Sequence, residues 1–161
     1  MTDDTRWLDA DEQQTWRSFV TASRLFFDRI ERQLQQEAGL PHAYYEILVR
    51  LSEAPGRTLR MSELAATSLA SRSRLSHAVA RMEAAGWVRR RPFDRDRRGA
   101  LAELTDAGFA RLEDAARGHV ETVRELLFDA LTPQQQECLR EVCDAIVEHL
   151  PEGPRWPAQP A

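Results

Sequence analysis

The chain has 161 residues, of which 42 % are apolar and 30 % are charged, a composition typical of one ordinary globular domain and not of a disordered chain. No apolar run approaches the roughly 18 residues of a membrane-spanning helix, and the acidic N-terminus lacks the apolar core of a signal peptide, so we expect a cytoplasmic protein. Two cysteines, Cys138 and Cys143, are too few for a disulfide scaffold or a four-ligand zinc site.

The charge is distributed unevenly along the chain. All 22 basic residues are arginines, and the formal net charge is −4. Residues 57–98 nevertheless carry a net charge of +7, whereas residues 1–56 carry −4 and residues 99–161 carry −7. A basic segment between two acidic ones is typical of a module that binds a polyanion such as nucleic acid.

The first segment predicts one long helix. Asp9 and Glu12 have the spacing of a capping box, and apolar residues then recur at steps of three and four until Gly39 ends the pattern. A helix over residues 11–37 would be about 40 Å long. Helices of this length commonly protrude from a small domain and pair with another element.

Three short elements follow the long helix. Pro41 suits the first turn of a second helix, whose apolar stripe includes Tyr44. Residues 58–60 predict a small edge strand. Ser62 is placed to cap a short helix, with Glu63 in its first turn.

The next predicted helix runs from Ser71 to Gly86 and has two different faces. Its inner face is apolar, whereas its outer face is small and polar and is flanked by Arg74 and Arg81. Small side chains on an outer face allow a partner surface to approach closely. The inner residues are Leu75, Val79 and Met82, and the outer ones are Ser73, His77, Ala80 and Ala84.

The remainder predicts a hairpin and two helices. Residues 87–91 and 100–104 predict strands, joined by a polar loop over residues 92–99. Thr105 caps a second long helix, and Thr132 caps the last helix, which has a proline at its first position.

This order of elements is typical of a winged helix-turn-helix. The chain resembles the MarR family of transcriptional regulators over roughly residues 8–150. The residues that carry the resemblance are Leu64-Ala65, the run Ser71–Val88, the segment Asp94–Arg98 and the segment Leu104–Gly108. The most specific piece is Asp-Arg-Arg at 96–98, followed six residues later by Leu-Thr. We therefore expect a mainly α fold with a small β-hairpin wing, in which a winged helix-turn-helix is joined to a helical dimerisation region.

The expected domain organisation follows this resemblance. The dimerisation region is discontinuous, because the DNA-binding domain is inserted between its two parts. The expected parts are an N-terminal arm at 1–10, the dimerisation region at 11–56 and 105–150, the winged helix-turn-helix at 57–104 and a disordered Pro-rich tail at 151–161.

The resemblance also implies a function. We expect a homodimer that binds double-stranded DNA at a pseudo-palindromic operator and represses transcription until a small aromatic or phenolic effector releases it. Repression is favoured because a protein bound at an operator near a promoter blocks polymerase without further machinery. We expect no cofactor, no metal and no enzymatic activity, since the sequence has no phosphate-binding loop, nucleophile elbow or metal motif.

Site residues are transferred from the resemblance one by one. The recognition helix is expected at about 72–85. The expected DNA-binding residues are Ser73, Arg74, His77 and Arg81 on that helix and Arg95 and Arg97 in the wing. Asp96 and Arg98 match the ion pair that stabilises the family's wing. Trp16, Phe19, His42 and Tyr45 are candidates for an effector cleft between the first two helices and the fifth, although a stripe at helical spacing is also typical of plain core.

Two alternatives stay open. The chain could be a helical homodimeric interaction protein without DNA binding, although such a protein has no need of the basic segment. It could also be a redox-sensing regulator acting through Cys138 or Cys143, two residues that lie about 8 Å apart on one helix and cannot bridge within the chain. A metal site assembled from His42 and His119 would lack clustered ligands in the sequence.

Overall fold

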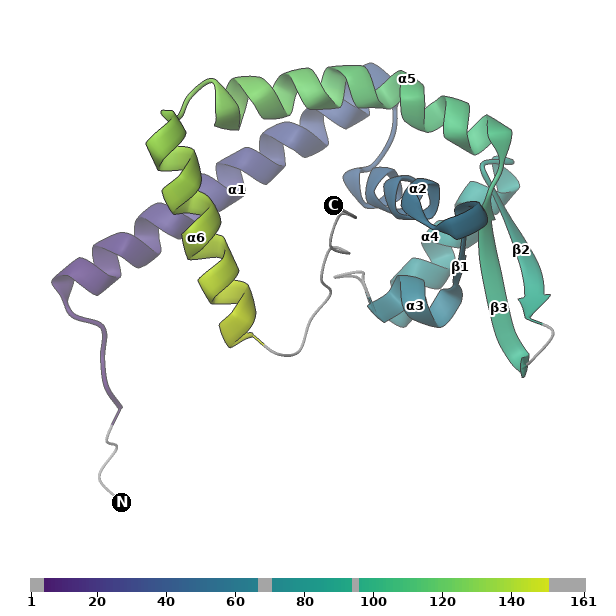
Figure 1. The fold of residues 1–161 in the computed structure, drawn as a ribbon, viewed down its shortest axis with the longest axis horizontal. Coiled ribbons are helices and arrows are strands. Elements are labelled where there is room, and N and C mark those ends of the chain that lie inside the picture. Colours follow the sequence, from purple (N-terminus) through teal and green to yellow (C-terminus); the bar gives the residue numbers. More distant parts are fainter. Residues whose placement is uncertain (1–4, 67–70, 94–95, 151–161) are drawn as a thin grey trace.

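The computed structural model describes residues 5–66, 71–93 and 96–150, and at residues 96–98 it describes only the backbone. The fold is mainly helical with one small sheet, which confirms the expected class (Figure 1). In chain order the elements are α1 (Ala10–Ala38), α2 (His42–Glu53), a 3₁₀ turn (Pro55–Arg57), β1 (Thr58–Arg60), α3 (Met61–Ala66), α4 (Arg72–Ala84), β2 (Val88–Phe93), β3 (Asp96–Leu104), α5 (Asp106–Val123), a π-helical turn (Arg124–Phe128) and α6 (Pro133–His149).

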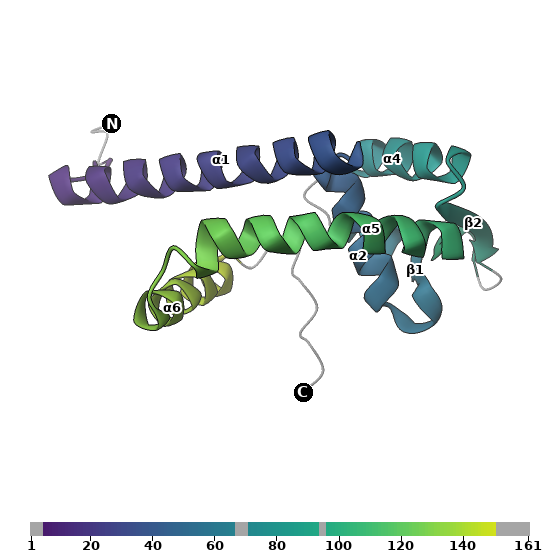
Figure 2. The same ribbon diagram turned by 90° about the horizontal axis from the view of Figure 1, so that it is seen from above.

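The two long helices form a beam that connects the two ends of the molecule. Helices α1 and α5 run side by side in opposite directions, with α2, α3, α4 and the sheet gathered at one end (Figures 1 and 2). Helix α6 turns back from the other end of α5. No helix in the described part of the chain is both long and apolar enough to cross a membrane.

Local capping determines where most helices begin. The Asp9 carboxylate accepts the Glu12 N–H at 2.9 Å, and the Glu12 carboxylate accepts the Asp9 N–H at 2.9 Å, so the predicted capping box is confirmed. Thr132 forms the same arrangement with Gln135 at the start of α6. Gly39 ends α1 at a φ of 55°, a left-handed conformation that glycine adopts without strain.

The sheet is antiparallel with strand order β1-β3-β2, and α5 starts directly against it. The Thr105 hydroxyl accepts the Gly108 N–H at 3.0 Å and donates to the Gly86 carbonyl at 2.7 Å. A Cβ atom on Gly108 would collide with the carbonyl oxygen of Trp87. The Leu-Thr-x-x-Gly pattern thus caps α5 and allows the helix to sit against the backbone of Trp87, directly before β2.

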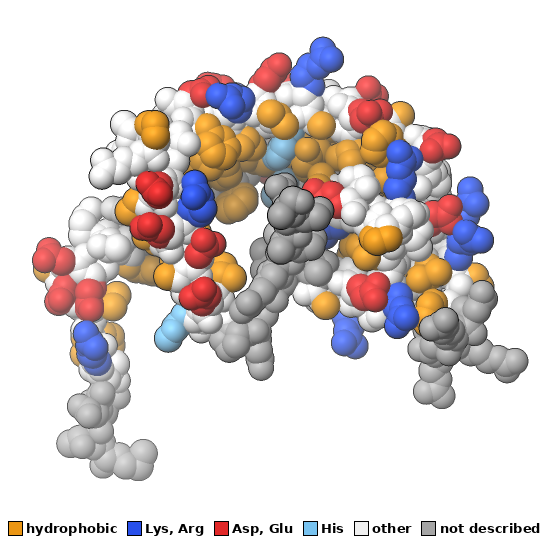
Figure 3. Space-filling model, viewed as in Figure 1, with side chains coloured by type: hydrophobic (Ala, Val, Ile, Leu, Met, Phe, Trp, Pro, Cys, Tyr) orange, Lys and Arg blue, Asp and Glu red, His pale blue; other side chains and the backbone are white. Residues whose placement is uncertain are grey.

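Buried apolar residues concentrate in the winged half of the molecule, which is the end formed by α2, α3, α4 and the sheet. Leu48 and Leu51 of α2, Leu64 of α3 and Val79 and Met82 of α4 are fully buried. By contrast, every residue from 137 to 150 is exposed, including the predicted apolar stripe of α6. On the face shown in Figure 3, acidic side chains lie along α6, and hydrophobic ones line the hollowed side beneath α5. The chain by itself therefore leaves the apolar surface of its helical arms without cover.

Two details of the sequence prediction were wrong. Helix α3 begins at Met61, so Ser62 lies inside it, because the Glu63 carboxylate accepts the N–H of Arg60 at 2.9 Å and caps the helix one residue earlier. The strands of the hairpin reach Phe93 and start again at Asp96, so the loop expected over 92–99 is much shorter. Helix α5 ends at Val123 and is followed by a π-helical turn over Arg124–Phe128. The segments 1–4 and 151–161 lie outside the described residues.

Candidate nucleic-acid interface

Helix α4 presents a polar and basic face to solvent. Its N-cap is Ser71, whose hydroxyl accepts the Arg74 N–H at 3.4 Å, as predicted. Leu75, Val79 and Met82 are buried, which confirms the inner stripe, and Ala78 is buried beside them. The structure brings four predicted DNA-binding residues to one exposed surface, namely Ser73, Arg74, His77 and Arg81. That these side chains contact DNA stays a prediction.

The described arginines of the winged half fall into two sets. Four of them form ion pairs with N–O distances between 2.7 and 3.8 Å: Arg57 with Asp106, Arg60 with Glu63, Arg90 with Glu83 and Arg91 with Glu103. Four others are exposed and form no ion pair with any residue that the structure describes: Arg72, Arg74, Arg81 and Arg89. Three of these four belong to α4. An unpaired guanidinium keeps its forked donors available for phosphate oxygens or the edge of guanine.

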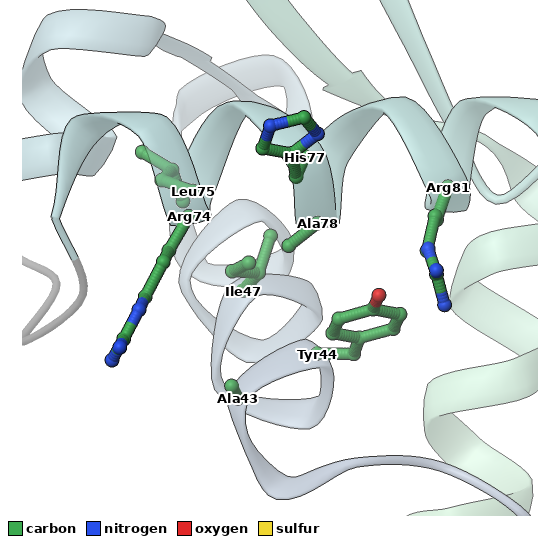
Figure 4. Close-up of a pocket in the computed structure, with 8 residues that line it drawn as sticks. All are labelled: Ala43, Tyr44, Ile47, Arg74, Leu75, His77, Ala78 and Arg81. Carbon is green, nitrogen blue, oxygen red and sulfur yellow. The ribbon is translucent and has the colours of Figure 1, made fainter.

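A groove of about 500 Å³ separates α4 from the N-terminal half of α2 (Figure 4). Arg74 and Arg81 extend on its two sides, and the Tyr44 ring lies between α2 and α4 with its hydroxyl directed towards α4. Ile47 and Ala78 lie between the two helices. None of the eight described residues that line the groove is acidic. The groove is therefore a basic extension of the α4 surface. The sequence analysis assigned Tyr44 only to the apolar stripe of its helix.

The wing supplies a second basic surface. Strands β2 and β3 pair in antiparallel register with Arg91 opposite Leu101, and Arg89, Arg90 and Arg91 are exposed. Arg95 lies outside the described residues. The side chains of Asp96, Arg97 and Arg98 are also outside the description, so their roles at the wing stay predictions.

Glu83 joins helix α4 to strand β2 of the wing. Its carboxylate accepts the Arg90 backbone N–H at 3.0 Å and the Arg90 Nε–H at 2.7 Å. These side-chain and backbone hydrogen bonds from Arg90 lower the pKa of Glu83. The sequence reasoning missed this contact, although Glu83 could have been found as one of only four acids in the basic segment 57–98.

The four candidate effector residues separate into two groups. Trp16 and Phe19 are about half exposed, and their ring centroids lie 6.3 Å apart. His42 and Tyr45 instead pack around His119 of α5, with centroid separations of 6.2 and 4.4 Å. Eleven positions along α1, about 16 Å, separate Trp16 from Phe27, whose ring centroid lies 6.1 Å from that of His42. His42 and Tyr45 therefore belong to a different part of the molecule from Trp16 and Phe19.

The group around His119 lies where α1, α2 and α5 meet. The His42 N–H donates to Glu31 of α1 at 3.0 Å, and Nδ1 of His119 is buried with no hydrogen-bond partner among the described residues. Burial, and secondarily the charge of His42, lowers the pKa of His119, and burial raises the pKa of Tyr45. The described residues contain no group of three or more metal-ligating side chains, here or elsewhere.

Phe19 lines a different hollow, of about 610 Å³, between α1 and α6. Its walls are almost entirely apolar and include Phe26, Leu127, Leu139 and Cys143. Both cysteines are exposed. The hollow lies among the side chains that the single chain leaves without cover.

Several known proteins resemble this chain. The model of the MarR family matches residues 38–99. HTH-type transcriptional regulator PecS of Dickeya dadantii (strain 3937) is 30 % identical over 128 residues, which cover 78 % of this chain and 76 % of PecS. Transcriptional repressor MprA of Escherichia coli (strain K12) is 28 % identical over 108 residues, which cover 67 % of this chain and 52 % of MprA.

A solved structure matches nearly the whole chain. It is the crystal structure of Sco3205, a MarR family transcriptional regulator from Streptomyces coelicolor, in complex with DNA. The TM-score is 0.87 at 49 % sequence identity, and the match covers 99 % of this chain and 95 % of Sco3205.

Proposed function

The chain belongs to the MarR family of transcriptional regulators, and on this basis we propose that it is a homodimeric, sequence-specific repressor that a small aromatic or phenolic effector releases from its operator. Ser73, Arg74, His77 and Arg81 contact the major groove, and the wing arginines Arg95 and Arg97 contact the backbone or the minor groove. Asp96 and Arg98 hold the wing in shape.

The observation that most strongly supports DNA binding is the set of unpaired arginines on α4. Arg72, Arg74 and Arg81 are exposed and form no ion pair among the described residues, while acidic partners engage four arginines elsewhere in the same half of the molecule. Sco3205, a 49 % identical relative, was solved in complex with DNA. Together these facts favour DNA binding over the alternative of an interaction protein without DNA.

Uncovered apolar surface supports a dimer. Trp16 and Phe19 of α1 are 57 % and 51 % exposed, and Val142 and Ile146 of α6 are 49 % and 41 % exposed. Apolar surface of this extent is rarely left to solvent in a monomer. A second copy would cover it and would bring two recognition helices to one duplex, with half-sites about one helical turn, roughly 34 Å, apart.

The proposed effector acts where His42, Tyr45 and His119 meet. This group joins the helices of the proposed dimer to the winged half, so a ligand there would change the angle between them and the separation of the two recognition helices. Trp16 and Phe19, by their exposure, are better placed to contact the second copy. The name of MprA as a repressor supports repression. The redox alternative would use Cys138 or Cys143, both of which are exposed.

The test is a titration of the protein with duplexes selected from a random pool, followed by fluorescence anisotropy. The proposal expects two chains per duplex. It also expects a large loss of affinity in Arg74→Ala and none in Arg117→Ala, a change of the same type at an exposed arginine of α5. Equal binding by both variants would remove α4 from the interface.

Effector release is tested on the same duplex with a panel of phenols and aromatic acids. A compound that weakens DNA binding must itself bind more weakly to the DNA complex, by the same factor. If no compound changes the DNA affinity, release by an aromatic effector is wrong.

A further inference from the structure

The groove between α2 and α4 has a basic rim and an apolar base. Its rim carries the side chains of Arg74, His77 and Arg81, and its base is formed by apolar residues such as Ile47 and Ala78. Arg74 and Arg81 are seven residues apart, so both project from the same flank of the helix. A ligand suited to this groove is anionic and must reach it from the exposed side of α4.

DNA backbone meets both conditions, and this step rests on the proposed function. A recognition helix in the major groove has a sugar-phosphate strand along each of its flanks. The flank of α4 that faces α2 is the one lined by arginines and free of acidic side chains. The opposite flank carries Glu83, which Arg90 engages.

Among the described residues that line the groove, Tyr44 is the one from α2 whose side chain carries a polar group. Its ring packs against the buried core and is half-buried, while its hydroxyl is directed towards α4 between the positions of His77 and Arg81. A tyrosine held in this way donates a hydrogen bond at a small cost in side-chain entropy, and tyrosine hydroxyls are regular donors to DNA phosphates.

We propose that Tyr44 is a DNA-contacting residue, whose hydroxyl donates a hydrogen bond to a phosphate oxygen of the strand that lies along the groove between α2 and α4. Arg74 and Arg81 bind the same strand by charge. Helix α2 thereby takes part in DNA binding on one side, while the adjacent Tyr45 packs against His119 on the other.

Two single-hydroxyl deletions on α2 provide a matched pair of variants. Tyr44→Phe and Ser52→Ala each remove one hydroxyl from α2, and thermal unfolding of both variants verifies that they are folded. Affinity is measured for the selected operator and for a random duplex at several salt concentrations, with Arg81→Ala as the charged reference. Tyr44→Phe should bind both duplexes about tenfold more weakly per chain, the effect of one hydrogen bond to a charged group. Ser52→Ala, whose hydroxyl donates to the Val49 carbonyl at 2.7 Å, should bind them like the wild type.

The salt dependence identifies what Tyr44 contacts. A neutral hydroxyl displaces no counterion, so Tyr44→Phe should leave the slope of log K against log salt unchanged, whereas Arg81→Ala should reduce it by about one ion per chain. Replacing single phosphates of the duplex by neutral methylphosphonates should identify the contacted phosphate. At one position the replacement should weaken DNA binding by the wild type, and it should not weaken DNA binding by Tyr44→Phe any further.

Other results would overturn the proposal. Wild-type affinity in Tyr44→Phe would exclude the contact, and a loss on the operator alone would mean that Tyr44 contacts a base. If the wild type itself binds no duplex, the proposed function fails together with this assignment, and that result differs from a defect confined to Tyr44→Phe.

Discussion

The Glu83 carboxylate holds Arg90 by its backbone N–H at 3.0 Å and by its side chain at 2.7 Å, so the last turn of α4 is fixed to strand β2. The contact removes one arginine from the set available to DNA. It also sets the position of the wing relative to α4. In the proposed complex both surfaces meet one duplex, so we expect their relative position to affect affinity.

Replacing Glu83 by Gln should therefore affect stability and DNA binding. The pKa of Glu83 is lowered from 4.5, so the pair stabilises the fold above that pH, and this contribution is lost as pH falls through the lowered pKa. Both side chains are more than a third exposed, so the loss at neutral pH should be at most about 1 kcal/mol. Urea unfolding at pH 7 should show this loss in Glu83→Gln and no loss in Glu113→Gln on α5, and the difference between Glu83→Gln and the wild type should shrink as pH falls through the lowered pKa. Identical curves for Glu83→Gln and the wild type would contradict it.

His119 should make stability depend on pH in the mildly acidic range. Its pKa is lowered from 6.5 by burial and by His42, so the unfolded chain binds a proton more readily than the folded one. The free energy of unfolding should be highest above pH 6.5 and should fall as pH drops through the lowered pKa. His119→Asn should flatten this dependence, and His149→Asn at the exposed end of α6 should retain it. A wild type whose stability is constant between pH 7 and pH 5 would refute the assignment.

The apolar face of α6 should hold the dimer together. Ile146→Arg introduces a charge into this face, whereas Glu148→Arg introduces the same side chain on the opposite, polar face. Light scattering at micromolar concentration should give a dimer mass for the wild type and Glu148→Arg and a monomer mass for Ile146→Arg. A monomeric wild type would remove the dimer from the account.

The wing and the recognition helix should contribute differently to DNA binding. Arg97→Ala should weaken binding to specific and random duplexes alike and reduce the salt slope by about one ion per chain, because a wing arginine responds to phosphates and groove width. His77→Ala should cost about 1–3 kcal/mol on the operator with little effect on random DNA, if His77 contacts a base. Titration of both duplexes at several salt concentrations distinguishes the two. An unchanged affinity and slope in Arg97→Ala would exclude the wing as a DNA contact.

Most element boundaries could be predicted because helix caps depend on side chains a few residues away. Asp9, Ser71, Thr105 and Thr132 each accept a backbone N–H three residues later, as their spacing indicates. The prediction that Ser62 caps α3 failed because the Glu63 carboxylate accepts the N–H of Arg60, and this competing cap starts the helix earlier. The loop prediction for 92–99 failed because β2 extends to Phe93 and β3 starts at Asp96, and backbone pairing there needs no apolar alternation in the sequence.

Contacts between distant residues could not be predicted in the same way. His42 and His119 are 77 positions apart and meet only because α1, α2 and α5 converge. Tyr44 and Tyr45 are neighbours with similar sequence surroundings, yet one faces α4 and the other faces α5. The packing angle of α2 determines which helix each tyrosine faces, and hydrophobic periodicity alone does not predict that angle.

The most direct test of the central claim is to incubate the purified protein with fragments of the genome of its source organism and to sequence the fragments that it retains. The account predicts enrichment of a small set of fragments that share a pseudo-palindromic sequence, with half-sites about one helical turn apart and located near promoters. Arg74→Ala should lose this enrichment, and Arg117→Ala should retain it. Retained fragments that share no sequence, or no retained DNA at all, would contradict the assignment of this chain as a sequence-specific regulator.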